Sequence, residues 1–157
     1  MFISIDGGIL PKASTDNSAG LDVFINETIE IWAGFQEVVK LGIKLDLEEV
    51  KKLEITHNHF LDLRVRSSMR LRGLSSLGDG VIDLDYPEEF KMVIHNHNRD
   101  GRVQFNKGDK IGQLILIQHN ERATWKYRQT TEQRAGGFGS TDKTMTGEEF
   151  TEMFKGK

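Results

Sequence analysis

The sequence has no cysteine, only two prolines among its 157 residues, and no long hydrophobic run. The lack of cysteine excludes a disulfide scaffold, a cysteine-ligated zinc site and a thiol nucleophile, and it fits the reducing cytoplasm. No apolar run approaches the roughly 20 residues that span a bilayer. The first residues also lack the apolar stretch and cleavage site of a signal peptide. We therefore expect a cytoplasmic protein that is not associated with a membrane.

The charges of the chain nearly balance, with 21 Lys and Arg against 24 Asp and Glu and a net charge of −3. Such a balance argues against stable, broad electrostatic binding to nucleic acid. The hydrophobic share of 37% and the 16 glycines are compatible with a folded globular chain. The length suits one domain, and no linker-like composition divides it.

Short runs of alternating polar and apolar residues dominate the first two-thirds of the chain. The clearest run is 61–66, in which Leu, Leu and Val alternate with Asp, Arg and Arg. A period of two is typical of a half-buried strand. Glycines or Asn and Asp separate most of the runs, which predicts an all-β sandwich or barrel. The other runs lie at 2–5, 21–25, 28–31, 35–41, 91–95, 102–105 and 111–118.

Two segments have helical patterns. Asp46 followed by Glu49 has the form of a capping box and predicts a short internal helix that reaches about residue 54. Thr146 and Glu149 form a second such box. It is followed by Phe150, Met153 and Phe154 at helical spacing, which predicts a short C-terminal helix. A helix this short needs a surface to dock on, in this chain or in a partner.

The segment 134–141 places three glycines around Phe138 and ends on two hydroxyls. The backbone N–H groups of such a loop can converge on an anion, and Arg134, Ser140 and Thr141 add side-chain donors. Phe138 offers a flat face to a base. Taken alone, the same residues are also compatible with a flexible tail that carries an incidental aromatic side chain.

Four further segments carry polar residues beside strands. Residues 80–86 contain Asp83 and Asp85, which an extended strand would place on one face, next to a Val-Ile pair that we expect to be buried. Residues 66–68 are Arg-Ser-Ser, a phosphate-binding composition. Residues 108–115 form a turn and an apolar strand that bears Gln113, and residues 19–22 end on Asp22.

These five segments, in this order, resemble the five motifs of the trimeric dUTPase family, and together with the upstream Leu-Pro pair they span residues 10–141. The resemblance implies a jelly-roll-like β-barrel or sandwich and a homotrimer whose active sites are shared between chains. It also implies hydrolysis of dUTP to dUMP and pyrophosphate with Mg²⁺ as cofactor. That reaction keeps uracil out of DNA and supplies dUMP for dTMP synthesis.

The resemblance also implies a role for each matching residue. Asp83 would activate the water that attacks the α-phosphorus. Tyr86 would pack against the deoxyribose and exclude a 2′-hydroxyl, and the backbone near Lys91 would read the uracil edge. Asp22 would support the magnesium ion through water. The remaining substrate-binding residues implied are Arg66, Ser67, Ser68, Gly80, Gln113, Arg134, Phe138, Gly139, Ser140 and Thr141.

The same resemblance divides the chain into three parts. Residues 1–133 would form a single β domain that carries the first four motifs. Residues 134–141 would be a flexible arm that closes over the substrate, and residues 142–157 an additional tail, with the short helix described above.

The sequence departs from the family pattern at several points. Pro87-Glu88 stands where the family usually has Arg-Gly, so the turn after Tyr86 must close differently. Arg134 lies four residues before Phe138 rather than five, which leaves Arg128 as an alternative phosphate contact. Ser68 replaces a commoner glycine, and the stretch 48–57 is longer than the family's turn.

Three other interpretations are open to the sequence. A dCTP deaminase, or a bifunctional deaminase and dUTPase, has the same fold and an Arg-Ser-Ser segment, but the glutamate it needs is replaced here by residues 92–94, Met-Val-Ile. A metal site could use His57, His59, His95 and His97. We expect these histidines to be solvent-facing strand residues instead. A non-catalytic interaction protein could use the tail.

Overall fold

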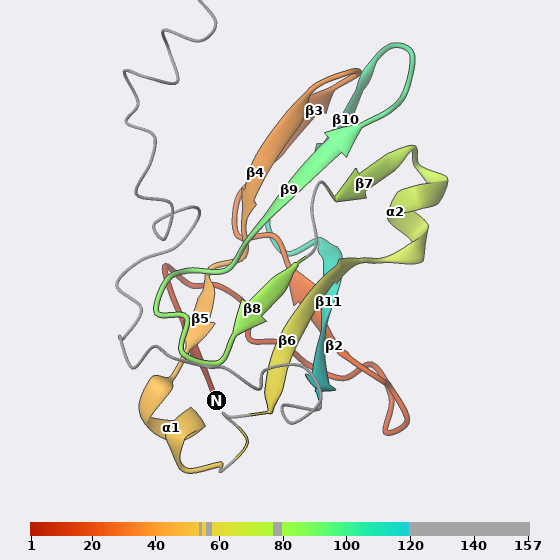
Figure 1. Cartoon of the computed structure of the whole chain (residues 1–157). Helices are drawn as coiled ribbons and strands as arrows, with labels where there is room; N and C mark the ends of the chain where they lie inside the picture. Colours follow the sequence, from red (N-terminus) through yellow and green to blue (C-terminus); the bar gives the residue numbers. More distant parts are fainter. Residues whose placement is uncertain (54, 56–57, 77–79, 120–157) are drawn as a thin grey trace, which may run out of the picture.

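The computed structural model describes residues 1–53, 55, 58–76 and 80–119 (Figure 1). Its strands come first in the chain as β1 (Phe2–Ser4), β2 (Leu21–Phe24), β3 (Ile29–Trp32), β4 (Gln36–Lys40) and β5 (Ile43–Leu45). After the short helix α1 (Leu47–Lys51) come β6 (His59–Val65), the helix α2 (Ser67–Leu71) and β7 (Leu74–Ser76). The last strands are β8 (Val81–Asp83), β9 (Lys91–Asn96), β10 (Arg102–Phe105) and β11 (Lys110–Gln118).

The named strands pair antiparallel, in sheets ordered β2-β11-β6-β8, β4-β9-β7, β3-β10 and β1-β5. The all-β prediction is confirmed. Among the described residues, however, the strand pairing does not join the sheets into one closed barrel. Strands distant in sequence lie side by side, such as β2 with β11, so each site residue depends on long-range pairing.

The alternation that predicted strands also decides which side chains are buried. In β6, Leu61, Leu63 and Val65 are buried, whereas Asp62 and Arg64 point away from the core. Strands β2, β9 and β11 contribute to the same apolar core. The core residues that are fully shielded from solvent include Ile31, Leu41, Ile43, Phe90, Ile94, Phe105 and Ile111.

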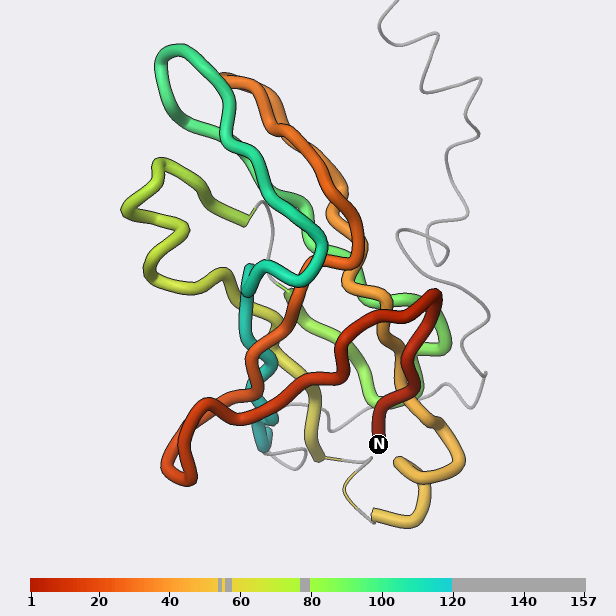
Figure 2. The backbone as a smooth tube through the Cα atoms, turned by 180° about the vertical axis from the view of Figure 1, so that it is seen from behind, coloured from red at the N-terminus to blue at the C-terminus, as the bar shows by residue number. Residues whose placement is uncertain are grey.

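The chain between β1 and β2 crosses the back of the molecule before it enters β2 (Figure 2). Its return is fixed by a two-residue bridge, in which Lys12 N donates to Asp22 O at 3.2 Å and Asp22 N donates to Lys12 O at 2.8 Å. The bridge holds Ser14 next to the Asp22 side chain, where it donates a hydrogen bond.

The internal helix α1 begins where the sequence predicts and ends earlier than predicted, at Lys51. Asp46 accepts a hydrogen bond from Glu49 N at 3.3 Å, as an N-cap should. The reciprocal half of the capping box does not form. Asp46 N donates to Met1 O instead, and the Glu49 carboxylate pairs with Lys52. No described helix is long and apolar enough to cross a membrane.

Several expectations need correction. The second helix α2 and the strands β5 and β7 were not predicted, because elements of three to five residues are too short to show a period. Asp83 and Asp85 do not share one extended strand, since β8 ends at Asp83 and the chain turns at once. Val81 is 56% exposed rather than buried. The predicted C-terminal helix and both domain boundaries lie outside the described residues.

A buried amide, Asn96, connects three elements at the end of β9. Its Nδ2 donates to Ile31 O at 2.8 Å, and its Oδ1 accepts from Asn98 N and Asn98 Nδ2. Asn98 Nδ2 also donates to Arg72 O at the end of α2. Because Asn96 is fully shielded from solvent, its hydrogen bonds hold the β3 region and α2 at fixed positions relative to β9.

Replacing Asn96 tests this connection. Asn96→Ala leaves Ile31 O and the Asn98 donors without their buried partner, so we expect the free energy of unfolding to fall by about 1–3 kcal/mol. Urea denaturation at a fixed protein concentration measures the change. Asn106→Ala, at an exposed turn position, is the control and should stay within about 0.5 kcal/mol of the wild type. Equal effects of the two substitutions would contradict a structural role for Asn96.

Candidate active site

The sheet β2-β11-β6-β8 carries residues from four of the five sequence segments singled out above. Asp22 lies on β2 and Gln113 on β11, and the two residues are directly opposite each other. Gln113 is also opposite Arg64 on β6, two residues before Arg66. Asp83 ends β8, the neighbour of β6 on its other edge. The sheet therefore fixes where each of these side chains sits.

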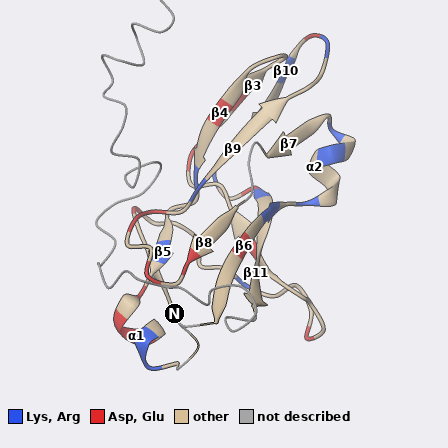
Figure 3. Ribbon diagram, viewed as in Figure 1, with Lys and Arg blue, Asp and Glu red and all other residues tan. Residues whose placement is uncertain are grey.

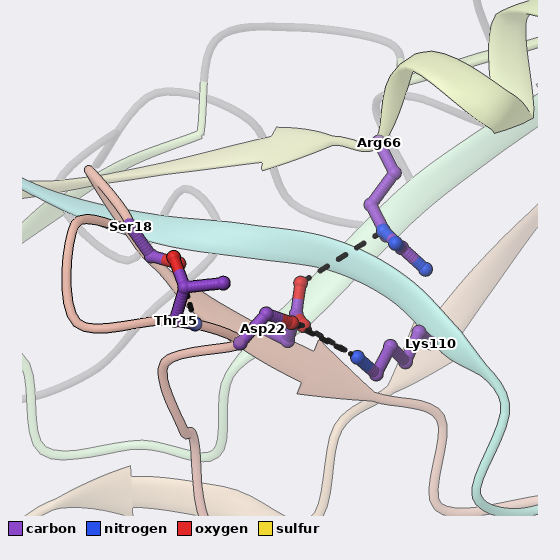
Figure 4. A network of polar contacts seen from close by, with 6 residues as sticks. Thr15, Ser18, Asp22, Arg66 and Lys110 are labelled. Carbon is purple, nitrogen blue, oxygen red and sulfur yellow. Dashed lines mark hydrogen bonds and ion pairs between the residues drawn. The ribbon is translucent and has the colours of Figure 1, made fainter.

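Asp22 is the centre of a charged cluster at one end of this sheet (Figure 4). Its Oδ2 accepts hydrogen bonds from Lys110 Nζ at 2.7 Å and from Ser14 Oγ at 2.5 Å. Arg66 Nε lies 3.8 Å from its Oδ1, a looser ion pair. Asp22 is only 8% exposed, so its charge is held in a shielded position between two cations.

These contacts determine the ionisation of Asp22. Burial alone would raise the pKa of its carboxyl. The hydrogen bonds from Lys110 and Ser14, with the charges of Lys110 and Arg66, outweigh burial and hold the pKa below its ordinary value of 3.8. Asp22 is therefore an anion at neutral pH, and it keeps the Lys110 and Arg66 side chains together.

The residues predicted to bind phosphate lie next to this cluster. Arg66 is the N-cap of α2, and Ser67 and Ser68 are its first two residues, both exposed. Gln113 is half-buried, next to Asp22 across the β2–β11 pair. The structure thus brings Asp22, Arg66, Ser67, Ser68 and Gln113 to the same end of the sheet.

Asp83 lies at the opposite end of β6. The strand register places Asp83 opposite Phe60 and Val81 opposite Asp62. Gly80 lies so close to β6 that a Cβ there would be 2.0 Å from Leu63 O, so only glycine fits. Tyr86 N donates to Asp83 O at 3.1 Å, which closes the turn that follows β8. Asp83 itself is exposed, whereas Tyr86 is 8% exposed.

The two ends of the sheet also differ in charge. Figure 3 shows positive residues where β6 runs into α2, and negative residues at the end of β8 and in the segment after it. The positive group includes Arg64, Arg66, Arg70 and Arg72. The negative group includes Asp83, Asp85, Glu88 and Glu89. An anionic ligand is therefore favoured at the α2 end rather than at the β8 end.

The distance between the two ends of the sheet limits which residues of one chain can act together on a substrate. Phe60, opposite Asp83, is six residues from Arg66 along β6, and strands rise by roughly 3.3 Å per residue. Asp83 and Arg66 are therefore separated by about 20 Å within a chain. A reacting water must lie about 3 Å from its base. The described residues of one chain thus place Asp83 and the Arg66 cluster at separate ends of the sheet.

Two polar residues of the cluster were missed by sequence reasoning. Lys110 belongs to a segment that the sequence analysis singled out, but only Gln113 was assigned a role there. A bulge between Lys110 and Gly112 turns the lysine toward Asp22. No sequence pattern indicates Ser14 as a site residue, because only the Lys12–Asp22 bridge brings it to the site.

The histidine alternative finds no support in the described residues, where no group of three or more His, Asp or Glu side chains could hold a metal ion. The rings of His95 and His97 are tilted at 46° to each other with centroids 4.2 Å apart, and His97 Nε2 lies 2.6 Å from Ser75 Oγ. His59 Nδ1 is 3.0 Å from Ile55 O. His57 lies outside the described residues, as do Arg128, Arg134, Phe138, Gly139, Ser140 and Thr141.

Comparison with known proteins gives a consistent result. Residues 6–142 match the dUTPase family. The chain is 34% identical over 141 residues to the deoxyuridine 5′-triphosphate nucleotidohydrolase of Rickettsia bellii, with 85% of this chain and 87% of that protein covered. It is 32% identical over 143 residues to the protein of that name from Kluyveromyces lactis, with 89% and 90% covered.

Solved structures agree with the fold. The dUTPase of Streptococcus mutans matches with a TM-score of 0.63 and 26% identity over 76% of this chain and 95% of that one. A mutant dUTPase from phage phi11 of S. aureus, described with a structural Mg(II) ion, matches with a TM-score of 0.68. It is 19% identical, and 84% of this chain and 96% of that one are covered.

The lowered pKa of Asp22 predicts a pH dependence of stability. The contribution of Asp22 is complete above the unfolded-state pKa of 3.8 and is lost as the pH falls through the lower folded-state pKa. We expect Asp22→Asn to reduce the free energy of unfolding by about 1–2 kcal/mol at pH 7. This difference from the wild type should shrink below pH 3.8.

Urea denaturation at pH 7, 5 and 3 measures the difference, with the exposed residue Asp100 changed to Asn as the control. The control should differ little from the wild type at each pH. A difference for Asp22→Asn that stays constant or grows toward pH 3 would contradict the ion-pair account.

Proposed function

The chain belongs to the dUTPase family, and we propose that it is a dUTP diphosphatase, which hydrolyses dUTP to dUMP and pyrophosphate. The observation that carries this function is the family match over residues 6–142, together with the placement of Asp22, Gln113 and Asp83 on one sheet and of Arg66 directly after its strand β6. The deaminase alternative is not favoured, because both the family and the curated relatives are dUTP hydrolases.

The proposed mechanism assigns the proton-accepting role to Asp83. It is exposed at the end of β8, at the negative end of the sheet, where a carboxylate can accept a proton from water. The water oxygen bonds to the α-phosphorus while the bond from that phosphorus to the bridging oxygen of the β-phosphate breaks. Pyrophosphate leaves with the bond electrons, so the reaction needs no covalent enzyme intermediate.

The triphosphate is proposed to bind at the positive end of the sheet. Arg66 can donate to phosphate oxygens through its guanidinium, and Ser67, Ser68 and Gln113 offer neutral donors beside it. Asp22 holds the Arg66 guanidinium and Lys110 in place from behind. The cationic cluster therefore supplies positioning and charge neutralisation, which are the main requirements of phosphoryl transfer.

The residues present fit a magnesium ion that arrives with the triphosphate. Mg²⁺ keeps several waters and takes few protein ligands, so one ionised carboxylate such as that of Asp22 is enough to support it. Asp22 Oδ2 makes both short contacts, whereas Oδ1 has Arg66 Nε at 3.8 Å. Asp22 would thus support the ion through water from Oδ1. When bound, the ion neutralises charge on the phosphate oxygens.

The nucleoside is proposed to bind at the β8 end of a chain. Tyr86 would pack against the deoxyribose, and the backbone near Lys91, the first residue of β9, would read the uracil edge. Gly80 shapes the start of the β8 segment through its close approach to β6. Phe138 would stack on the base, and Arg134 or Arg128, with Gly139, Ser140 and Thr141, would close on the phosphates as residues 134–141 fold over the site.

The assembly is proposed to be a homotrimer with shared sites. The backbone separation of about 20 Å between Asp83 and Arg66 supports this, because a second chain could bring its own Arg66 close to the Asp83 of the first. The exposed apolar residues of the same sheet, Val81 at 56% and Leu116 at 45%, also favour association. Residues 1–133 would form the domain of each chain and 142–157 an additional tail. The cytoplasm, where nucleotides are made, is the proposed location.

Substrate selectivity tests the function directly. We expect pyrophosphate release from dUTP with Mg²⁺, and far less from dCTP or UTP. Ammonia release from dCTP would instead support the deaminase. No turnover of any of the three nucleotides would contradict an enzymatic function for this chain.

Asp83→Asn tests the mechanism. The amide cannot take the proton from water, so we expect turnover of dUTP to fall by about 10²–10⁴-fold while dUTP still binds. Pyrophosphate release and equilibrium binding are the measurements. Asp85→Asn, in the same turn, is the control and should retain most of the activity. Full activity of the Asp83 variant would remove Asp83 from this role.

A further inference from the structure

The segment between Tyr86 and Phe90 lacks the glycine that the family pattern leads one to expect after the tyrosine. Pro87 and Glu88 occupy these positions, so the chain must be held by other means. It begins with the hydrogen bond from Tyr86 N to Asp83 O at 3.1 Å. It ends at Phe90, which is fully shielded from solvent. The contacts of Glu89 and Phe90, at the end of this segment, show what holds it in place.

Phe90 is joined to the connection between β4 and β5 by two backbone hydrogen bonds. Leu41 N donates to Phe90 O at 3.0 Å, and Phe90 N donates to Ile43 O at 2.8 Å. Gly42, between these two residues, donates its N–H to Glu89 Oε1 at 3.0 Å. This last bond is partly buried and charge-assisted, so it is stronger than a bond between neutral groups.

Gly42 gives Glu89 a rigid anchor. Its φ of +65° is a left-handed conformation that suits glycine, and its carbonyl accepts from Ile5 N at 2.7 Å. A Cβ at Gly42 would come within 2.5 Å of the Asn26 side chain and 2.8 Å of Gly8 Cα. The chain is therefore packed closely around Gly42, and only glycine fits at this position.

Phe90 connects the Glu89–Gly42 contact to Tyr86. The rings of Tyr86 and Phe90 lie with centroids 6.2 Å apart, and Phe2 packs edge-on against Phe90 at 6.3 Å. Tyr86 thus rests on a residue whose backbone and neighbour are both fixed on the β4–β5 connection. A shift of the segment after Tyr86 would move the tyrosine ring relative to the strand that ends at Asp83.

We propose that Glu89 is a positioning residue for sugar selection, which holds Tyr86 where its ring leaves no space for a 2′-hydroxyl. The inference rests on the function proposed above. Excluding one hydroxyl requires the ring to be placed to within a fraction of its own thickness, and misplacement by 1 Å is enough to change a reaction rate by orders of magnitude. The carboxylate of Glu89 fixes the far end of the segment on Gly42, in addition to the restriction that Pro87 places on its own φ.

The chain offers a matched control for this role. Glu27 Oε1 accepts from Lys40 N at 3.2 Å, so it is also a carboxylate that binds a backbone N–H, two residues before Gly42. That bond is exposed, and it does not involve the segment 86–90. Glu27→Ala therefore removes the same kind of contact from the same stretch of chain without releasing Tyr86.

The experiment compares kcat/KM for dUTP with kcat/KM for UTP in the wild type, Glu89→Ala, Glu89→Gln and Glu27→Ala. We expect Glu89→Ala to lower the dUTP-to-UTP ratio by about tenfold or more, mainly through faster turnover of UTP. Glu89→Gln keeps an oxygen that accepts from Gly42 N and should restore a ratio within about threefold of the wild type. Glu27→Ala should leave the ratio unchanged.

Amide hydrogen exchange at Gly42 provides a second readout that needs no substrate. Glu89→Ala should speed exchange at Gly42, whereas Glu27→Ala should not. A folded Glu89→Ala variant with the wild-type ratio, or a Glu27→Ala variant whose ratio falls equally, would overturn the inference. Unchanged exchange at Gly42 in Glu89→Ala would overturn it as well. An inactive wild type would instead contradict the proposed function.

Discussion

The antiparallel register of β6 is the constraint on which the rest of the account depends. Its pairing with β11 places Arg64 opposite Gln113 and brings Arg66, two residues later, near Asp22, and its pairing with β8 fixes Asp83 opposite Phe60. A shift of one residue in the pairing register of β6 would turn its buried leucines to solvent. The cationic cluster and the carboxylate are therefore kept apart by the same core that keeps the sheet folded.

This separation has a chemical use. The proposed mechanism needs one carboxylate at the attacking water and another beside Arg66 and Lys110, where it holds the phosphate-binding cations in place. Asp22 already occupies that position and is held as an anion by Lys110 and Arg66. One chain thus places a permanently ionised aspartate among the cations and a second aspartate in an acidic segment. Assembly of chains would unite the two in one site.

Much of the strand arrangement and the start of α1 could be predicted from the sequence, because both depend on local residue patterns. The alternation in β6 predicted its buried face, and Asp46 predicted the start of α1. The short helix α2, the bulge that turns Lys110 inward and the bridge that delivers Ser14 could not be predicted, since each depends on pairing between distant strands. The same limit hid the Glu89–Gly42 contact, 47 residues apart in the chain. Asp85 was placed wrongly because β8 is only three residues long.

The central claim is that each active site combines Asp83 of one chain with Arg66 and Ser67 of another. Mixed trimers test it most directly. An Asp83→Asn variant and an Arg66→Ala, Ser67→Ala double variant, each inactive alone, are unfolded together at equal concentrations and refolded. In random trimers each mixed assembly regains one complete site, so the mixture should recover about a quarter of the wild-type rate. A mixture with no more activity than its two components would show that each site lies within one chain, and would contradict the account.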